Sequence, residues 1–299
     1  MIATSNPDVK TARRPREGGR RFPLHWIGAL PFLLYVGLFL LLPTVIVVVG
    51  AFAGKDGPTL SNITELNQEF VLNAFVSSLL VSTASAVVGA VAGALLAYAV
   101  VTGNPRGVLR RVVTSASGVL AQFGGVTLAF AFIATIGSVG FVTLWLQDRG
   151  LNIYANGVWL TELPGLVLVY TYFQIPLMVL VFLPALDGIR PQWREATESL
   201  GGGTWHYWRY VAGPLLAPAF LGATLLLFAN SFSAYATANA LINQGQPVIS
   251  QQINGALSGE VGSFEPGFAK AIAVEMVIIV TLVTVVYSLL QRRTSRWLQ

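Results

Sequence analysis

Six long apolar stretches dominate this chain of 299 residues. Crossing the roughly 30 Å hydrocarbon core of a bilayer takes about 20 apolar residues in a helix. Backbone polar groups at that depth must bond within their own segment, so each stretch predicts a transmembrane helix. Only 10% of the residues are charged, too few to cover a water-facing surface of this size. The expected fold class is therefore an all-α polytopic membrane protein with six transmembrane helices, at residues 26–52, 73–101, 112–136, 160–186, 211–232 and 268–290.

The basic residues are divided unevenly between the two sides that six crossings create. Of the 18 Lys and Arg residues, only Lys55, Arg149 and Lys270 fall on one side. The positive-inside bias then predicts that both termini are cytoplasmic. This asymmetry also accounts for the net charge of +5 without a nucleic-acid partner. We expect a basic cytoplasmic tail at residues 1–25, a six-helix membrane domain at 26–290 and a cytoplasmic tail at 291–299.

Several polar side chains fall inside or at the ends of the expected spans, where they cost free energy unless they are paired or wetted. One interpretation is a water-lined path for a solute between the helices. The other is hydrogen bonding that only holds the bundle together. We take the path as the hypothesis, and its candidate residues are Gln122, Tyr170, Asn230, Ser231, Ser233, Tyr235 and Glu275.

Small residues recur at every fourth position of the second stretch, at Ser85, Gly89, Gly93 and Ala97. This spacing places them on one helix face, where a neighbouring backbone can approach closely. The sequence favours packing within one subunit, and an interface between subunits is the alternative.

The sequence has few of the residues that catalysis or metal binding needs. It contains no cysteine, and its two histidines, His25 and His206, lie at the ends of the spans without partners at metal-ligand spacing. It also lacks the G-x-x-x-x-G-K-[ST] phosphate loop. We therefore expect no catalytic site, no metal site and no cofactor in this chain.

The longest expected cytoplasmic connection, at residues 187–210, carries the most specific signal. Pro191 precedes good helix formers, which predicts a short helix, and three glycines from Gly201 end it. The connection contains Glu195, Ala196, Thr197 and Gly201, and Pro214 follows at the start of the fifth span.

These residues resemble the signature of permease subunits of type I, binding-protein-dependent ABC importers, which have a MetI-like transmembrane fold. That pattern is Glu-Ala-Ala, three residues, Gly, nine residues, an aliphatic residue, one further residue and Leu-Pro. Thr197 replaces the second alanine, and Gly213 replaces the leucine. Within the family, residues 228–241 are most similar to permeases for polyamines, aminoethylphosphonate, thiamine and ferric ion.

The resemblance implies that residues 187–210 form a coupling helix seated in an ATP-binding subunit, where Glu195 faces basic side chains or backbone donors. ATP and Mg²⁺ would be bound by that partner, so this chain would not be an enzyme. The implied partners are two cytosolic ATP-binding subunits, a second permease, for which we favour a paralogue, and an extracytoplasmic solute-binding protein. The implied location is the plasma (inner) membrane of a bacterium.

The implied function is to form half of the translocation pathway for a small solute. The alternative is an ion-coupled secondary transporter, which predicts internal repeats and a charged site at the bilayer midplane. Neither is visible in the sequence. An intramembrane enzyme is the third class, and it lacks a plausible catalytic set.

Overall fold

The computed structural model describes residues 25–54, 57–103, 107–155, 157–242, 248–258 and 266–295. The side chains of residues 25–28 and 290–295 are not described. Residues 1–24 and 296–299, which make up most of the expected tails, lie outside the described residues. The chain divides into two units, Met1–Ile46 and Val47–Gln299, and each is considered by itself.

The first unit consists of consecutive helical segments, α1 (His25–Val36), the π-helical η1 (Gly37–Leu41) and the beginning of α2 (Leu42–Ala51). Its described side chains are apolar except for that of Thr44, and none of those up to Ile46 is buried. An unburied helix of this composition is expected to face lipid. It belongs to the first candidate membrane span, Ala29–Ala51.

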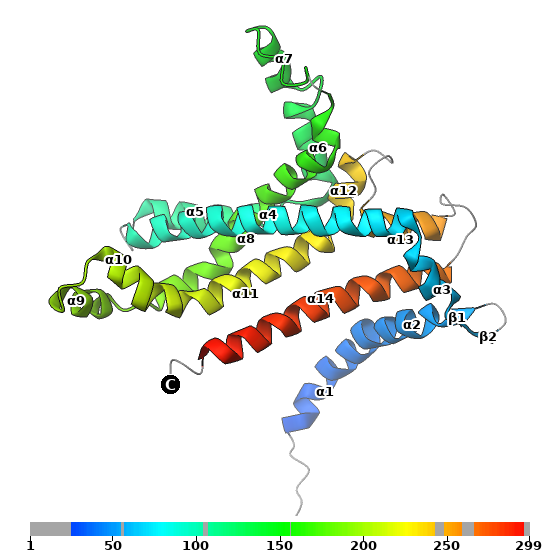
Figure 1. Cartoon of the computed structure of the whole chain (residues 1–299), viewed down its shortest axis with the longest axis horizontal. Coiled ribbons are helices and arrows are strands. Elements are labelled where there is room, and N and C mark those ends of the chain that lie inside the picture. Colours follow the sequence, from blue (N-terminus) through cyan, green and yellow to red (C-terminus); the bar gives the residue numbers. More distant parts are fainter. Residues whose placement is uncertain are drawn as a thin grey trace, which may run out of the picture. The chain divides into compact units, whose positions relative to one another are not determined.

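The second unit is built around three long helices that pack against one another, α4 (Glu69–Thr102), α8 (Leu163–Asp187) and α11 (Gly213–Phe232) (Figure 1). A fourth long helix, α14 (Pro266–Ser295), packs against α11 and α13 (Ile249–Ser258). Around them lie α5 (Val108–Leu120), α6 (Gly125–Ile136), α7 (Phe141–Gln147), α9 (Pro191–Ser199), α10 (Thr204–Tyr207), the π-helical η4 (Trp208–Ala212) and α12 (Ala236–Leu241).

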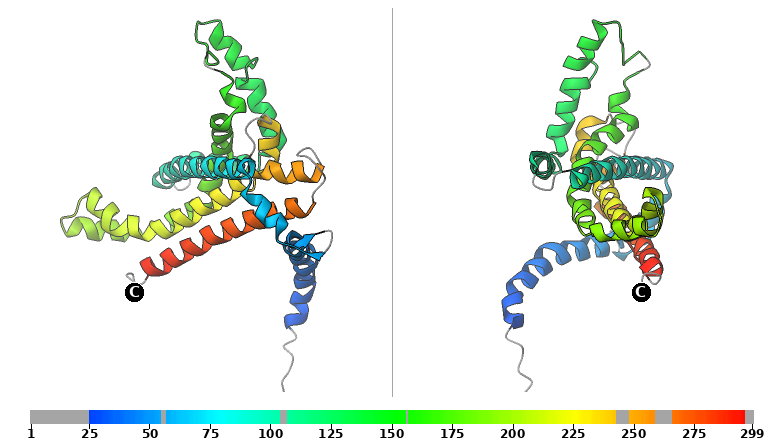
Figure 2. Two further views of the ribbon diagram at one scale, coloured as in Figure 1. Left: turned by 45° about the vertical axis from the view of Figure 1, so that its right-hand side comes forward. Right: turned by 90° about the vertical axis from the view of Figure 1, so that its left-hand side faces the viewer.

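Short elements precede α4 and α8. A two-stranded antiparallel hairpin, β1 (Ala53–Gly54) and β2 (Gly57–Pro58), is followed by α3 (Ser61–Thr64) and the 3₁₀ turn η2 (Glu65–Asn67). A second 3₁₀ turn, η3 (Trp159–Thr161), comes just before α8. In Figure 2, α6 and α7 continue away from the long helices.

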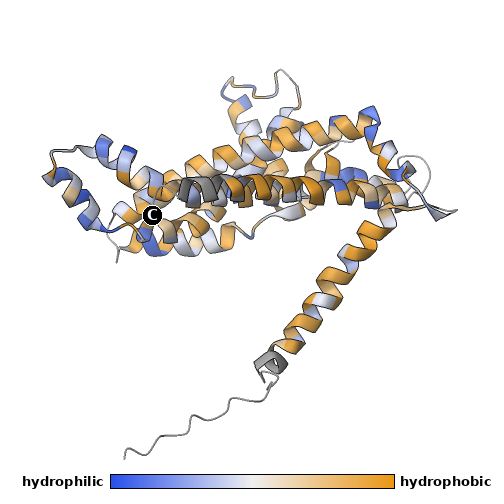
Figure 3. Cartoon of the chain, turned by 60° about the horizontal axis from the view of Figure 1, so that its bottom comes forward, coloured by the Kyte–Doolittle hydropathy of each residue, from blue (hydrophilic) through white to orange (hydrophobic). Residues whose placement is uncertain are grey.

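Six segments of the described residues are long and apolar enough to cross a membrane, which confirms the expected all-α, six-span fold. They are Ala29–Ala51, Glu69–Thr102, Gly125–Gln147, Leu163–Asp187, Thr204–Phe232 and Pro266–Leu289. Figure 3 shows apolar residues along the long helices and hydrophilic residues around α9.

The expected position of the third span, residues 112–136, is wrong. The chain breaks between α5 and α6, where Gly125 has φ +72°, a conformation that favours glycine. The span begins only at Gly125, and the separate helix α5 carries Arg110 and Arg111 in its first turn. Gln122 therefore lies in the break and not within a span.

The small-residue face of α4 packs within the subunit, as the sequence favours. Ser85, Gly89, Gly93 and Ala97 are all buried, and α4 packs most extensively on α8. A β-carbon at Gly93 would lie only 2.6 Å from the carbonyl oxygen of Ile175 in α8. The two backbones thus approach so closely that no larger residue fits.

Candidate functional site

The segment between α8 and α11 forms an ordered helix–turn–helix. Arg190 precedes α9, and Pro191 occupies its first turn. Proline has no backbone N–H, but an N–H at this position has no partner within the helix, so no hydrogen bond is lost. Gly201 ends the helix with φ +79°. The Gly202 N–H donates to the Thr197 carbonyl (2.9 Å) and the Gly201 N–H to the Glu198 carbonyl (3.0 Å). This is the hydrogen-bond pattern of a Schellman cap.

Two large apolar side chains are exposed on this otherwise hydrophilic segment. Leu200 is 89% exposed and Trp205 is 70% exposed. Glu195 and Ala196 are also exposed, whereas Thr197 is half-buried and its hydroxyl donates to the Trp193 carbonyl (2.8 Å). Exposed apolar side chains beside charged ones are typical of a surface that binds another protein.

The start of α11 explains the departure from the family pattern at Gly213. A β-carbon there would lie 2.4 Å from the carbonyl oxygen of Trp208. The π-helical turn η4, which ends just before Gly213, brings that carbonyl close. Pro214 follows in the first turn of α11. The glycine is therefore required by the local backbone, and a leucine at this position would need a different turn.

An ion pair ties the base of the same segment to α5. The guanidinium of Arg110 donates to both carboxylate oxygens of Asp187, the last residue of α8, with Nη1 to Oδ1 at 3.1 Å. The hydrogen bonds that Arg110 donates to Asp187 raise the pKa of Arg110 above its usual value. Both groups are partly exposed, so the pair contributes little stability by itself. It does fix the position of α5 against the end of α8.

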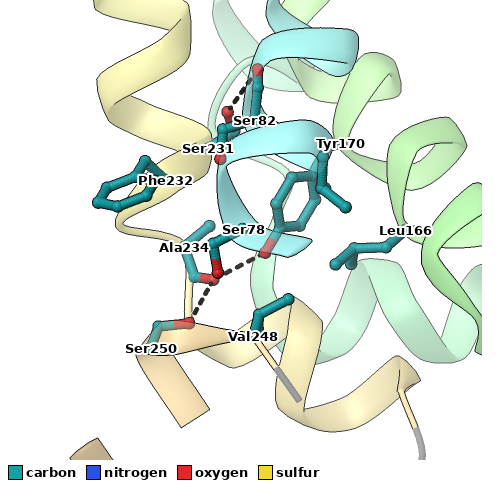
Figure 4. A pocket seen from close by; sticks show the side chains of 10 residues that line it. Ser78, Ser82, Leu166, Tyr170, Ser231, Phe232, Ala234, Val248 and Ser250 are labelled. Carbon is teal, nitrogen blue, oxygen red and sulfur yellow. Dashed lines mark hydrogen bonds between the residues drawn. The ribbon is translucent and has the colours of Figure 1, made fainter. Parts of the chain in front are cut away.

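Two of the candidate pathway residues, Tyr170 and Ser231, line a shared cavity (Figure 4). The Tyr170 hydroxyl donates to the Ala234 carbonyl (2.7 Å), and the Ser231 hydroxyl donates to the Ser82 carbonyl (3.4 Å). The Ile249 N–H, at the start of α13, donates to the Ser78 hydroxyl (2.7 Å). Hydroxyl groups thus join four helices at this point.

The cavity is small, with about 10 Å³ free for solvent, roughly enough for one water molecule. It is not an open channel. Its polar atoms mostly bond to one another, which fits the interpretation that they hold the bundle together. A larger path would have to lie on an outer face of these helices, between this chain and another.

The other candidate pathway residues do not line this cavity. Gln122, Asn230 and Ser233 are exposed, and Tyr235 is half-buried in the break between α11 and α12. Glu275 is half-buried in α14, and its Oε2 has no hydrogen-bond partner among the described residues. These residues lie on surfaces that another subunit or a solute could reach.

The sequence analysis missed Ser78, Ser82 and Ser250, which also line the cavity. A signal existed in α4, because Ser78, Ser82 and Ser85 continue its small-residue face at helical spacing. Ser85 meets Gln174 of α8, which is fully buried. With the amide oriented to satisfy its surroundings, Gln174 accepts from the Ser85 hydroxyl (3.0 Å) and donates to the Leu227 carbonyl (3.0 Å).

Comparisons with known proteins agree with this architecture. Residues 150–297, which include α8, the helix–turn–helix segment, α11 and α14, match the family "Binding-protein-dependent transport system inner membrane component". These residues, about half of the chain, therefore form a domain of this family. The predicted resemblance is confirmed.

The relatives are permease subunits. The chain is 26% identical over 218 residues to the sulfate transport system permease protein CysW of Escherichia coli K12, which covers 71% of this chain and 70% of that protein. It is 27% identical over 112 residues to the thiamine transport system permease protein ThiP of the same organism, covering 38% of this chain. The chain spans only 20% of ThiP and about half of a further permease relative.

The fold is also similar to a solved structure, that of a bacterial ABC transporter involved in the import of the acidic polysaccharide alginate. The TM-score is 0.74 at 18% identity, over 90% of this chain and 95% of that chain. At this identity the likeness concerns the fold alone. In sequence and in fold, the chain is thus similar to membrane permease subunits of ABC importers.

Proposed function

We propose that this chain forms half of the translocation pathway for a small solute, and that residues 187–210 couple it to an ATP-binding subunit. The exposed helix–turn–helix carries the proposal. Its Schellman cap gives it a defined shape, and the apolar side chains of Leu200 and Trp205 are largely exposed. A rigid surface of this kind is suited to a groove on a partner.

The remaining subunits follow from the family. We propose a second permease, two ATP-binding subunits that bind ATP and Mg²⁺, and an extracytoplasmic solute-binding protein. The positive-inside bias supports cytoplasmic termini and a cytoplasmic position for α9, in the plasma membrane of a bacterium. ATP hydrolysis would then occur outside this chain.

The structure suggests how movement at α9 reaches the membrane helices. The segment joins the end of α8 directly to the start of α11, and Arg110 links α5 to the same end of α8 through Asp187. A partner that displaces α9 would therefore displace three helices together. Rigid-body movement of this kind is one common way in which proteins switch between states.

The class of solute is a matter for direct test. The relatives include permeases for sulfate and for thiamine, which differ in charge. A cationic solute would favour a role for Glu275, and an anionic solute would favour the amides and hydroxyls at the end of α11. ATPase activity stimulated by the matching binding protein, measured with polyamines, phosphonates, thiamine, sulfate and iron, separates these possibilities.

The coupling proposal predicts different effects for two glutamates of α9. Glu195→Gln should lower uptake and binding-protein-stimulated ATPase activity about tenfold, because a charged hydrogen bond to a partner contributes about 1.5–3 kcal/mol. Glu198→Gln is the matched control. Glu198 is also exposed and pairs only with Arg194 at 3.0 Å within the described residues, a pair worth about 0.3–0.5 kcal/mol. Wild-type uptake in both variants would contradict the proposal.

The pathway proposal predicts that Asn230→Ala changes uptake several-fold while the complex with the ATP-binding subunits still assembles. Asn230 is exposed at the last turn of α11, so truncation removes a polar contact to the solute without opening the core. Thr224→Ala, on the same helix, is the control, because its hydroxyl bonds within its own helix to Phe220 (2.8 Å). Loss of assembly in Asn230→Ala would instead assign Asn230 a structural role.

A further inference from the structure

The cavity beside Tyr170 and Ser231 contains hydrogen-bond donors that the bonds within the bundle leave unused. The Ser78 hydroxyl accepts from the Ile249 N–H (2.7 Å), and the Ser82 carbonyl accepts from Ser231 (3.4 Å). Neither the Ser78 hydroxyl nor the Ser82 hydroxyl donates a hydrogen bond to a described residue, although both side chains are buried and line the cavity. Buried hydroxyl groups usually bond to protein or to ordered water, because an unsatisfied one is destabilising.

The same cavity also presents acceptors. The Tyr170 hydroxyl donates to the Ala234 carbonyl at 2.7 Å, and the Ser250 hydroxyl donates to the same carbonyl at 3.4 Å (Figure 4). A hydroxyl oxygen also carries lone pairs that accept hydrogen bonds, and those of Tyr170 and Ser250 accept none from a described residue. Unused donors from α4 and unused acceptors from α8 and α13 therefore line one small space.

We propose that this cavity binds one water molecule, which accepts hydrogen bonds from Ser78 and Ser82 and donates to Ser250 and Tyr170. The free volume of about 10 Å³ matches one molecule, since a buried water needs about 10–15 Å³ and two to four polar partners. Four partners from three helices are within this range. The bound water then completes the hydrogen bonds that join α4 to α8 and α13.

The chemistry of the cavity favours water over a metal cation. Every described residue that lines it is uncharged, so a cation would lose its hydration without gaining an opposite charge. Its carbonyl ligands are also in use. The Ser82 carbonyl accepts from Ser85 (3.3 Å) and Ser231, and the Ala234 carbonyl accepts from Tyr170 and Ser250. The unused hydroxyl protons need an acceptor, which water supplies and a cation does not.

Apolar side chains separate the cavity from bulk solvent. Leu166 and Val81 line it at 0% and 2% exposure, and Phe232 and Val248 line it at 2% and 4%. The bound water is therefore part of the folded structure and not a member of a solvated path. This role does not depend on which solute is transported or on the ATP-binding partner.

X-ray radiolysis with mass spectrometry tests the site on the full-length chain, purified with the subunits it retains. Hydroxyl radicals formed from a bound water modify the side chains beside it, even where bulk solvent does not reach them. We expect modification of Phe232, which lines the cavity. Phe182, which is 5% exposed and packs on Phe220 of α11, is the internal control and should stay unmodified. Modification of Phe232 no faster than that of Phe182 would overturn the proposal.

Substitutions in α4 test the same site separately. Ser82→Val places methyl groups in the cavity and removes a donor, so the modification of Phe232 should be lost. Thr83→Val is the matched control, because it removes a hydroxyl from the next, exposed position of α4, and it should leave the modification unchanged. If Ser82→Val does not fold, Ser250→Val fills the cavity from α13.

Modification of Phe232 that persists in a folded cavity variant would contradict the bound water. A second measurement replaces the sodium and potassium ions of the buffer with choline. We expect the modification of Phe232 to stay the same, because the cavity binds a neutral molecule. A change on removal of these ions would assign the cavity to a cation and would also overturn the proposal.

Discussion

Gly201→Val should abolish solute uptake and coupled ATPase activity while the chain still inserts into the membrane. At φ +79°, Gly201 has a left-handed backbone conformation that a β-branched residue adopts only with strain. Valine would therefore open the Schellman cap that joins Gly202 to Thr197 and would turn α9 away from α10. The membrane helices do not depend on this cap. Uptake, ATPase activity and insertion, measured on the same preparation, separate the two effects.

A neighbouring glycine is the matched control. Gly203 has an extended backbone, with φ −88° and ψ −177°, and a β-carbon there would meet nothing within 4 Å. Gly203→Val should therefore retain substantial uptake. Gly201→Asn should restore part of the loss, because asparagine tolerates the left-handed region. Equal uptake in Gly201→Val and Gly203→Val would contradict the interpretation that the shape of this turn transmits the movement.

Gly93→Leu should destabilise the folded protein by more than about 3 kcal/mol, the upper end of the usual cost of overpacking. Its β-carbon alone would lie 2.5 Å from the Met178 β-carbon and 2.6 Å from the Ile175 carbonyl oxygen. Because a backbone atom is one of these neighbours, a rotamer change cannot relieve the clash. The helices α4 and α8 would have to separate, and their buried contacts would be lost.

Thermal unfolding of the detergent-solubilised protein measures this effect. A loss of that size should lower Tm by about 6–12 °C, since 1 kcal/mol corresponds to about 2–4 °C in proteins of 150–250 residues. Gly118→Leu is the control. Gly118 is an exposed glycine of α5, and a β-carbon there would meet nothing within 4 Å. If both leucine variants unfold at the same temperature, the close approach of α4 and α8 does not limit stability.

For Ser231 and Tyr170, the sequence indicated that the residues matter but did not decide their role. Their polarity at bilayer depth marked them as important, but both alternatives, path and packing, were compatible with that polarity. Their distances to Ser82 and Ala234 show that they bond within the bundle. Gln122 was wrongly predicted to lie within a membrane span. Its assignment to a span followed average hydropathy, which does not detect the chain break at residues 121–124.

By itself, the sequence determined the six-span helical fold and the coupling-loop signature, because a bilayer requires long apolar helices and the signature depends on local residue order. It also predicted that one face of α4 packs closely against a neighbouring helix, because helical spacing places its small residues on that face. Only the tertiary structure decided where the third span begins and which hydroxyl groups meet across four helices. These features depend on contacts between residues far apart in the chain, and no local pattern of side chains specifies the distance between two helices.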